Sequence, residues 1–372
     1  MADWPTGTLR DVSVPKGLVG GPFGSSLGGR DYVPSGVPVI RGVNLASTAL
    51  FDSSEFVYVT PRKAYGELAR NLAVPGDVVF TQRGTLGQVG VVPPGPHEAY
   101  VISQSQMRVR VDPARADPRF VYYQFRSPAL VEAIRNSAIT TGVPHINLGI
   151  LAALPMVIPP LAEQVAIAEV LGTLDEKIAA NARLAATAHE LAAASFPAST
   201  GRATTLGEVI DLVYGKALPA KRRRPGPVPV YGSGGRSGSH DEPLVSGPGL
   251  IVGRKGTAGS IHWEPAGFFP IDTTYYVRLK DPNIPMEYAY FLLSGLGLSG
   301  MNSDSAVPGL NRSRALAVPI SLPAPEAIAA FTERARPLFA LRDQLARENQ
   351  ALSATRDYVL PRLLDGRLRV TG

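Results

Sequence analysis

The chain has 372 residues, no cysteine and a net charge of +6. This length suffices for two or three domains with their own cores, and the lack of cysteine excludes disulfides and thiolate metal sites. The five histidines are scattered without an H-x-x-x-H pair, so we expect no metal site. No apolar run reaches the ~20 residues of a membrane span, and the first residues do not form a signal-peptide pattern, which predicts a cytoplasmic protein.

The first 160 residues predict a domain of short strands and turns. A Gly/Ser loop covers residues 17–29, and strands are expected at 77–80, 89–92 and 101–111. A turn at 81–87 joins the first two of these strands. Residues 118–137 predict a helix, and residues 138–160 have an irregular pattern.

A long helix is predicted over residues 161–196, between Pro159-Pro160 and Pro197. Apolar residues recur along it in steps of three and four, which is the seam of a coiled coil. The seam positions are Leu171, Leu174, Ile178, Ala185, Ala188 and Ala192. A helix of this length is about 50 Å long and indicates a spacer between two globular halves.

The second half repeats the landmarks of the first half in the same order. Residues 250–259 parallel the strand and turn at 77–87, and residues 307–311 parallel residues 143–147. Residues 285–293 match the first half's short helix. A second long helix, 325–360, closes the repeat, with Leu338, Leu341, Leu345, Leu352 and Val359 on a seam broken by Glu348 and Thr355. The shared order predicts an internal duplication.

Signatures of enzymes are absent from the sequence. The run at 232–238 has the spacing G-x-G-x-x-x-G and no βαβ context, and residues 254–257 lack the order of a phosphate-binding loop. No methyltransferase N-P-P-[YF] loop, nuclease motif or nucleophile elbow is present. We therefore expect no catalytic residues in this chain.

Both globular halves carry an excess of Lys and Arg, whereas residues 161–195 carry an excess of acid. This distribution favours a polyanion as partner of the globular halves and proteins as partners of the helices. Glycine and serine let backbone N–H groups approach phosphates, and Arg and Gln have the geometry to read base edges. In the first half the candidate DNA-binding residues are Gly24, Ser25, Ser26, Arg41, Gln82, Arg83, Thr85 and Gln104.

The second half offers a more basic set of candidates. They are Lys216, Lys221, Arg222, Arg223, Arg224, Tyr231, Ser233, Arg236, Arg254, Lys255 and Thr257. For the run 221–224, a solvated loop is as good an explanation as phosphate contact. For the turns that contain Arg83 and Arg254, we expect a mixed role, in which the glycines shape the turn and the basic residues face DNA.

Several segments together resemble the DNA specificity subunit of type I restriction–modification systems, over nearly the whole chain. They are GPFGSSL at 21–27, PVYGSGGRSGSHDE at 229–242, GPGLIVGRKGTAG at 247–259, PIDTTYYV at 270–277, IPPLAEQVAIAEVLGTLDEKI at 158–178 and LSATRDYVLPRLLDGRLRV at 352–370. The chain departs from the family at 324–327, where APEA replaces the usual P-P-x-x-E-Q.

The resemblance implies an α+β fold with two target-recognition domains, separated by two long antiparallel coiled-coil helices and related by a pseudo-twofold repeat. The corresponding boundaries are 1–160, 161–196, 197–324 and 325–372. It implies a non-catalytic subunit that recognises a bipartite target in double-stranded DNA. Its expected partners are two methyltransferase subunits, which bind the S-adenosylmethionine, and a motor–nuclease subunit; the chain itself is expected to bind no cofactor, metal or membrane.

Two other classes of function stay open at this stage. One is a recognition scaffold from another phage-defence or methyltransferase complex that uses the same fold. The other is a methyltransferase or nuclease, against which the length and the missing motifs argue.

Overall fold

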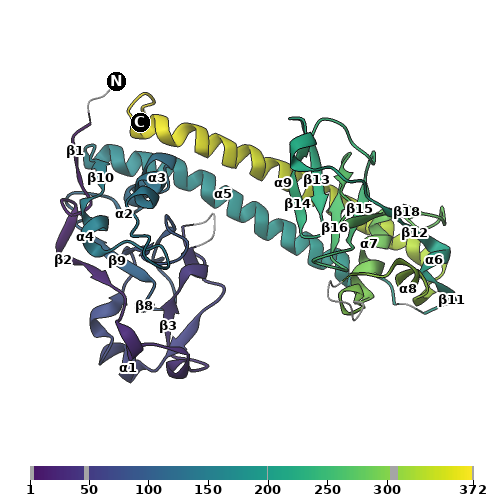
Figure 1. Cartoon of the computed structure of the whole chain (residues 1–372), viewed down its shortest axis with the longest axis horizontal. Coiled ribbons are helices and arrows are strands. Elements are labelled where there is room, and N and C mark those ends of the chain that lie inside the picture. Colours follow the sequence, from purple (N-terminus) through teal and green to yellow (C-terminus); the bar gives the residue numbers. More distant parts are fainter. Residues whose placement is uncertain (1–3, 46–49, 199, 302–308, 371–372) are drawn as a thin grey trace. The chain divides into compact units, whose positions relative to one another are not determined.

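The computed structural model describes residues 4–45, 50–198, 200–301 and 309–370. It divides into two compact units, one formed by residues 1–181 with 348–372 and the other by residues 182–347. Two long helices, α5 (Leu161–Ala194) and α9 (Pro325–Leu364), each contribute one segment to either unit (Figure 1).

The globular part of the first unit is built from ten short strands and several short helices. Its strands are β1 (Thr6–Thr8), β2 (Ser13–Gly20), β3 (Val37–Ile40), β4 (Val57–Val59), β5 (Leu72–Ala73), β6 (Val78–Thr81), β7 (Val89–Val91), β8 (Tyr100–Ile102), β9 (Gln106–Val111) and β10 (Pro155–Val157). Its α-helices are α1 (Pro61–Tyr65), α2 (Pro118–Phe125), α3 (Pro128–Asn136) and α4 (Leu148–Ala153), and its 3-10 helices are η1 (Gly24–Ser26), η2 (Gly29–Asp31), η3 (Gly42–Leu45) and η4 (Ala69–Asn71).

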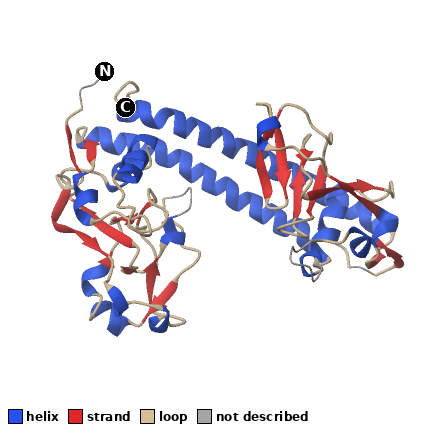
Figure 2. Cartoon of the chain, viewed as in Figure 1, coloured by secondary structure: helices blue, strands red, loops and turns tan. Residues whose placement is uncertain are grey.

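The globular part of the second unit follows the same plan in fewer residues. Its strands are β11 (Arg202–Thr205), β12 (Ile210–Tyr214), β13 (Val228–Gly232), β14 (Gly235–His240), β15 (Gly249–Gly253), β16 (Ile261–Glu264), β17 (Phe269–Pro270), β18 (Thr274–Leu279) and β19 (Pro319–Leu322). Its helices are α6 (Leu206–Val209), α7 (Met286–Gly295), α8 (Arg312–Leu316), η5 (Ala220–Arg222) and η6 (Leu298–Gly300). The strands of both units are drawn in red in Figure 2.

The sheet topology confirms the internal repeat. Each unit has one antiparallel four-stranded sheet, in the order β2-β9-β6-β7 in the first unit and β12-β18-β15-β16 in the second. Each also has one parallel pair, which aligns Val39 with Val101 in β3 and β8, and Val230 with Phe269 in β13 and β17. A two-stranded sheet, β1-β10 or β11-β19, joins the start of each unit to the strand that precedes its long helix.

Each unit buries its sheet against short helices and long-helix segments. In the first unit Phe80 and Phe125 pack edge to face at 5.0 Å, in a core that includes Leu171 of α5 and Leu363 of α9. In the second unit Phe331 of α9 lies in the core with strand residues. Because the apolar residues of the long helices complete both cores, we expect neither globular part to be independent of its helices.

Four secondary-structure predictions for the first half were wrong in detail. Residues 17–20, expected to lie in the Gly/Ser loop, form the end of β2. The expected strand at 101–111 is two strands, because a turn in which Gln106 N donates to Ser103 O separates β8 from β9. The expected helix at 118–137 is two helices, because Ser127 is extended, caps α3 and precedes Pro128. Residues 138–160, expected to be irregular, contain α4 and β10.

The α5 seam is confirmed at its apolar positions and contains polar residues that the sequence pattern did not predict. Leu171, Ala188 and Ala192 are buried, and Leu174, Ile178 and Ala185 are half-buried. Asp175 and Asn181 are also buried on this helix. On α9, Leu345 is buried, and Leu338, Leu341, Leu352 and Val359 are half-buried.

The polar seam residues bind one another in the first unit. Arg356 Nη1 lies 2.7 Å from Asp175 Oδ1, and the Tyr123 hydroxyl donates to Asp175 Oδ2 at 2.9 Å. Asn181 Nδ2 donates to Asn349 Oδ1 at 3.0 Å, and Asn349 Nδ2 donates to Ile178 O at 3.1 Å. The α9 seam therefore passes through Asn349 and Arg356, one residue beyond the predicted breaks at Glu348 and Thr355.

Candidate nucleic-acid interface

The turn between β6 and β7 presents polar side chains at the surface of the first unit. Gly84 and Gly87 have φ values of 98° and 92°, which favour glycine, and they allow the chain to reverse sharply. Arg83 and Thr85, on either side of Gly84, are exposed. Ile146 N donates to Gln82 O at 3.0 Å, so the segment before α4 fixes the base of the turn.

A groove of about 700 Å³ collects most of the candidate residues of the first unit. Those that line it are Gly24, Ser26, Gln82, Arg83 and Gln104. The Gln104 side-chain amide donates to the carbonyl oxygens of Gly24 and Leu27, so it holds the η1 loop in place. Arg83 has no bonded side-chain partner among the described residues, and its guanidinium is free to bind a ligand.

Three other candidates of the first unit do not line this groove. Ser25 belongs to η1, and Thr85 lies at the exposed tip of the turn that carries Arg83. Arg41 lies elsewhere, and its Nη2 donates to Glu55 O at 3.1 Å. This bond ties Arg41 to the loop before β4.

The second unit has an equivalent turn between β15 and β16. Leu310 N donates to Arg254 O at 2.9 Å, as Ile146 N does to Gln82 O, so Arg254 is equivalent to Gln82 and Lys255 to Arg83. Gly256 and Gly259 have φ values of 78°, in the places of Gly84 and Gly87. Lys255 and Thr257 are exposed, as Arg83 and Thr85 are.

The turn between β13 and β14 lies beside this second turn. A Cβ on Gly256 would lie 3.2 Å from Ser233 Oγ, and one on Gly234 would lie 3.8 Å from Thr257 Oγ1. Ser233 O accepts a hydrogen bond from Ser260 Oγ, which joins the two turns. The fold therefore brings Ser233, Lys255 and Thr257 together, although they are distant in sequence.

Arg254 has a different environment from Arg83. It is half-buried, and its guanidinium carbon lies 5.3 Å from the ring centre of Tyr214, a residue that the sequence analysis did not select. Tyr214 is 53% exposed and packs edge to face on Tyr275 at 5.0 Å. Burial, followed by the neighbouring Tyr214, raises the pKa of Tyr275 to about 12, so Tyr275 stays neutral at physiological pH. The Tyr214 ring therefore orients Arg254 at the surface.

The basic run at 221–224 separates into free and bonded side chains. Lys221 and Arg222 are exposed, as are Lys216 and Arg236, and none of the four has a charged partner in the described part of the chain. Arg223 instead donates to Ser237 O at 2.6 Å and to Leu218 O at 3.3 Å.

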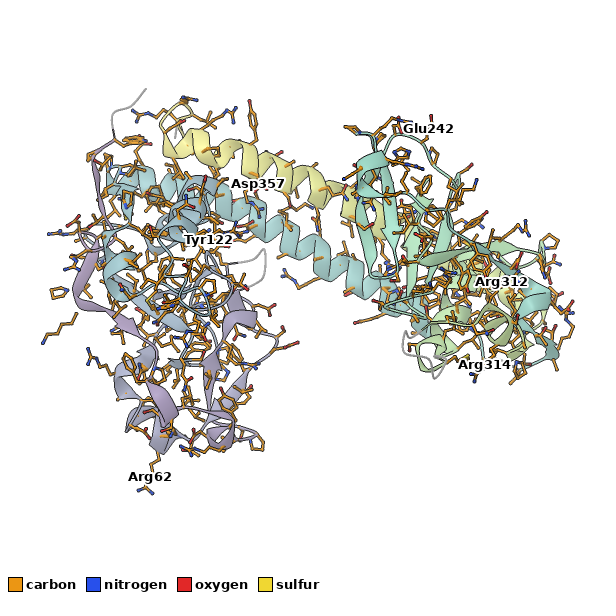
Figure 3. The ribbon with its side chains drawn as sticks, in the orientation of Figure 1. Arg62, Tyr122, Glu242, Arg312, Arg314 and Asp357 are labelled. Carbon is orange, nitrogen blue, oxygen red and sulfur yellow. The ribbon has the colours of Figure 1, made fainter. Side chains whose placement is uncertain are left out.

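Arg224 and Tyr231 are bonded within the protein. Arg224 pairs with Asp241 at 2.5 Å and with Glu242 at 3.2 Å, and the bond to Asp241 raises the pKa of Arg224 (Figure 3 labels Glu242). Tyr231 is buried, and its hydroxyl donates to Glu264 Oε2 at 2.9 Å. Burial is the first cause that raises the pKa of Tyr231. These side chains shape the β13–β14 hairpin.

In each unit a buried carboxylate and two arginines also stabilise the antiparallel four-stranded sheet. Asp77 receives two hydrogen bonds of 2.8 Å from Arg110, and Arg108 lies 3.7 Å away. In the second unit Asp211 binds Arg278 at 2.7 Å and also Arg312 (labelled in Figure 3). Burial alone would raise the pKa of Asp211, but the bonds from these arginines lower it. These arginines are thereby bonded to carboxylates of the protein itself.

Within the described residues there is no group of three His, Asp or Glu side chains placed to hold a metal ion. Among the same residues, no helix has the length and apolar character that crossing a membrane requires.

Residues 62–188 match the family model described as the type I restriction modification DNA specificity domain. This range, about a third of the chain, resembles that specificity domain. The matched range contains β6, β7, the turn with Arg83 and most of α5. No curated protein matches the chain.

Solved structures resemble the chain along nearly its whole length. The S subunit of a type I restriction–modification system from M. genitalium is 20% identical, with a TM-score of 0.64, and the match covers 97% of this chain and 96% of that chain. This likeness shows the shared fold. The HsdS subunit from Thermoanaerobacter tengcongensis is 17% identical, with a TM-score of 0.39 and coverage of 99% and 98%. A structure reported for complex assembly and conformational transition of the type I R-M system is also 17% identical, with a TM-score of 0.47 and 99% coverage of both chains.

Proposed function

We propose that this chain is the DNA-binding subunit that directs a type I restriction–modification complex to a bipartite target. Each unit reads one half of the target with side chains at its repeated turn. The observation that carries this proposal is the equivalence of the turns at 82–87 and 254–259, which present Arg83 and Lys255 at matching positions. Arg and Lys are the side chains that most often read guanine in the major groove.

The neighbouring groups suit a duplex with a charged backbone. In the first unit the free guanidinium of Arg83 stands beside the Gln82 amide. In the second unit Lys216, Lys221, Arg222 and Arg236 supply exposed cations for phosphates. Cations fix the register of a protein on DNA, and a few side chains at base edges give the sequence preference.

Catalysis belongs, in this proposal, to partner subunits. Two methyltransferase subunits with bound S-adenosylmethionine dock on the scaffold, and a motor–nuclease subunit joins them. The specificity subunit itself binds no cofactor. The acid-rich, exposed surface of α5 fits a role in contacts with protein rather than with DNA.

Salt dependence tests the proposed mode of DNA binding. The chain, assembled with its methyltransferase subunits, is expected to lose ~10³-fold or more in affinity for its selected duplex between about 50 and about 200 mM salt. The reason is that each phosphate contact releases counterions. Fluorescence anisotropy measures the affinity at each salt concentration, and an affinity that stays constant over the range contradicts the proposal.

The lengths of α5 and α9 are expected to set the unread gap between the two half-sites. Removing one heptad from the facing parts of both helices keeps the seam spacing and shortens each helix by about 10 Å, or roughly three base pairs. Selection from random duplexes should return the same half-sites with a shorter gap. Changed half-sites with an unchanged gap would refute this role.

A further inference from the structure

Phe23 is the most exposed large apolar side chain in the described part of the protein. It is 91% exposed and lines the groove of the first unit, between the end of β2 and η1. A solvent-exposed phenylalanine forgoes about 2 kcal/mol of burial free energy. An isolated exposed apolar residue is ordinary on a flexible loop, so the rigidity of this loop decides whether the ring has a role.

The loop that carries Phe23 is held from behind at several points. Gly21 N donates to Gln106 O at 2.8 Å, and a Cβ on Gly21 would lie only 2.1 Å from Ser103 O. Beyond Phe23, the amide of Gln104 binds the carbonyl oxygens of Gly24 and Leu27. Arg30 Nη2 donates to Ser25 O at 3.1 Å. These bonds fix the backbone on both sides of the ring.

A second set of bonds anchors the far end of the same loop. Gly28 N donates to Asp31 Oδ2 at 2.8 Å, and Lys63 Nζ lies 3.0 Å from Asp31 Oδ1. The hydrogen bond from Lys63 is the largest of the causes that lower the pKa of Asp31. The loop therefore presents the Phe23 ring to solvent instead of folding it onto the core.

The groove around Phe23 is mixed: Val19, Leu68 and Leu148 line it beside polar side chains, and its one carboxylate, Glu67, is bonded to Lys63. Arg83 and Arg70 are exposed cations of its lining, and neither is bonded through its side chain to a described residue. Gln82 and Asn71 add amides. A protein-binding hot spot needs a wider apolar surround. One ring among cations and amides is instead the arrangement with which proteins contact DNA bases by an apolar side chain.

The second unit lacks this ring. Gly215 N donates to Thr274 O at 3.1 Å, as Gly21 N does to Gln106 O, so the two glycines are equivalent. Two residues further along, Ala217 stands where Phe23 stands in the first unit. The position equivalent to Phe23 therefore offers no ring in the second unit.

We propose that Phe23 makes an apolar contact with the bases of the half-site bound by the first unit. The inference rests on the proposed function and adds a residue of the GPFGSSL segment that is not among the candidate DNA-binding residues. The ring either inserts at a base step and unstacks it or packs on a thymine methyl group. Both modes use the same apolar face, and duplexes with altered bases separate them.

The test compares Phe23→Ala, Phe23→Leu and the control Tyr65→Ala in the chain assembled with its methyltransferase subunits. Tyr65 is also exposed, at 55%, ends α1 in the same unit and does not line the groove. On the selected duplex we expect Phe23→Ala to bind about 10-fold more weakly, and Phe23→Leu and Tyr65→Ala to bind within about threefold of the unaltered protein. The base preferences of the second half-site should stay unchanged.

Two modified duplexes identify the contact. If the ring unstacks a base step, 2-aminopurine in the first half-site brightens on binding, and Phe23→Ala abolishes the increase. If the ring packs on a methyl group, replacing one thymine by uracil weakens the unaltered protein and leaves Phe23→Ala unaffected.

The proposal for Phe23 is overturned if Phe23→Ala binds like Tyr65→Ala, or if neither modified duplex responds to the substitution. It is also overturned if Phe23→Ala weakens recognition of both half-sites equally. If the unaltered complex fails to select any DNA sequence, the proposed function fails instead, which is a separate outcome.

Discussion

Replacing Asp175 by alanine is expected to destabilise the first unit by about 3 kcal/mol, because it leaves a buried guanidinium without its main partner. The side chains of Asp175 and Arg356 are only 6% and 8% exposed, and their closest N–O distance is 2.7 Å. The substitution also removes the acceptor of the Tyr123 hydroxyl. Arg356 keeps its bond of 2.9 Å to Asp357, which limits the loss.

A second ion pair between the same helices provides the matched control. Lys177 and Glu348 lie 3.3 Å apart, and their side chains are 51% and 37% exposed. Because solvent screens this pair, Lys177→Ala should cost less than about 1 kcal/mol. Urea denaturation followed by circular dichroism measures both free energies of unfolding. If Asp175→Ala and Lys177→Ala lower the free energy of unfolding equally, the conclusion that the buried pair stabilises the unit more than the exposed pair is wrong.

The long helices were predictable from sequence, but their polar seam residues were not. Pro160, Pro197 and Pro325 mark ends of the two helices, and the three/four spacing marks the buried faces of α5 and α9. The same spacing rule treats Asp175, Asn181 and Arg356 as surface residues, since it counts only apolar side chains. Their burial depends on partners from the other helix, and no pattern within one helix can supply that information.

The repeated turn was likewise predictable, because glycines at 84, 87, 256 and 259 and the landmarks around them recur in order. The sequence did not predict which arginines are free and which are bonded within the protein. Arg83 and Arg223 look alike in sequence, yet one is free at a groove and the other binds the carbonyl of Ser237. Hydrogen bonds to backbone atoms distant in the chain decide this difference.

Phe23 and Tyr214 escaped prediction for a related reason. Aromatic residues near strand ends are ordinarily buried, so the sequence does not predict an exposed ring at either position. The tightly bonded loop around Phe23 and the stacking of Arg254 on Tyr214 emerge only from the folded units.

Arg83→Ala and Lys255→Ala are expected to weaken different halves of the recognised DNA sequence, each by about 10- to 100-fold. Each side chain occupies the same place in its own unit, at a turn fixed by the segment before α4 or α8. Arg254→Ala should act on the same half as Lys255→Ala, because the two residues are neighbours. Exposed arginines outside the turns, Arg62 of the first unit (labelled in Figure 3) and Arg334 of α9, serve as controls.

Selection from a library of random duplexes, with the unaltered complex and each variant in parallel, measures these effects directly. We expect a split target, with base preferences lost in one half for Arg83→Ala and in the other half for Lys255→Ala. The two controls should return the unaltered target. Loss of preference in the same half for both variants, or a continuous target without a gap, would contradict the account of two units that each read one half-site.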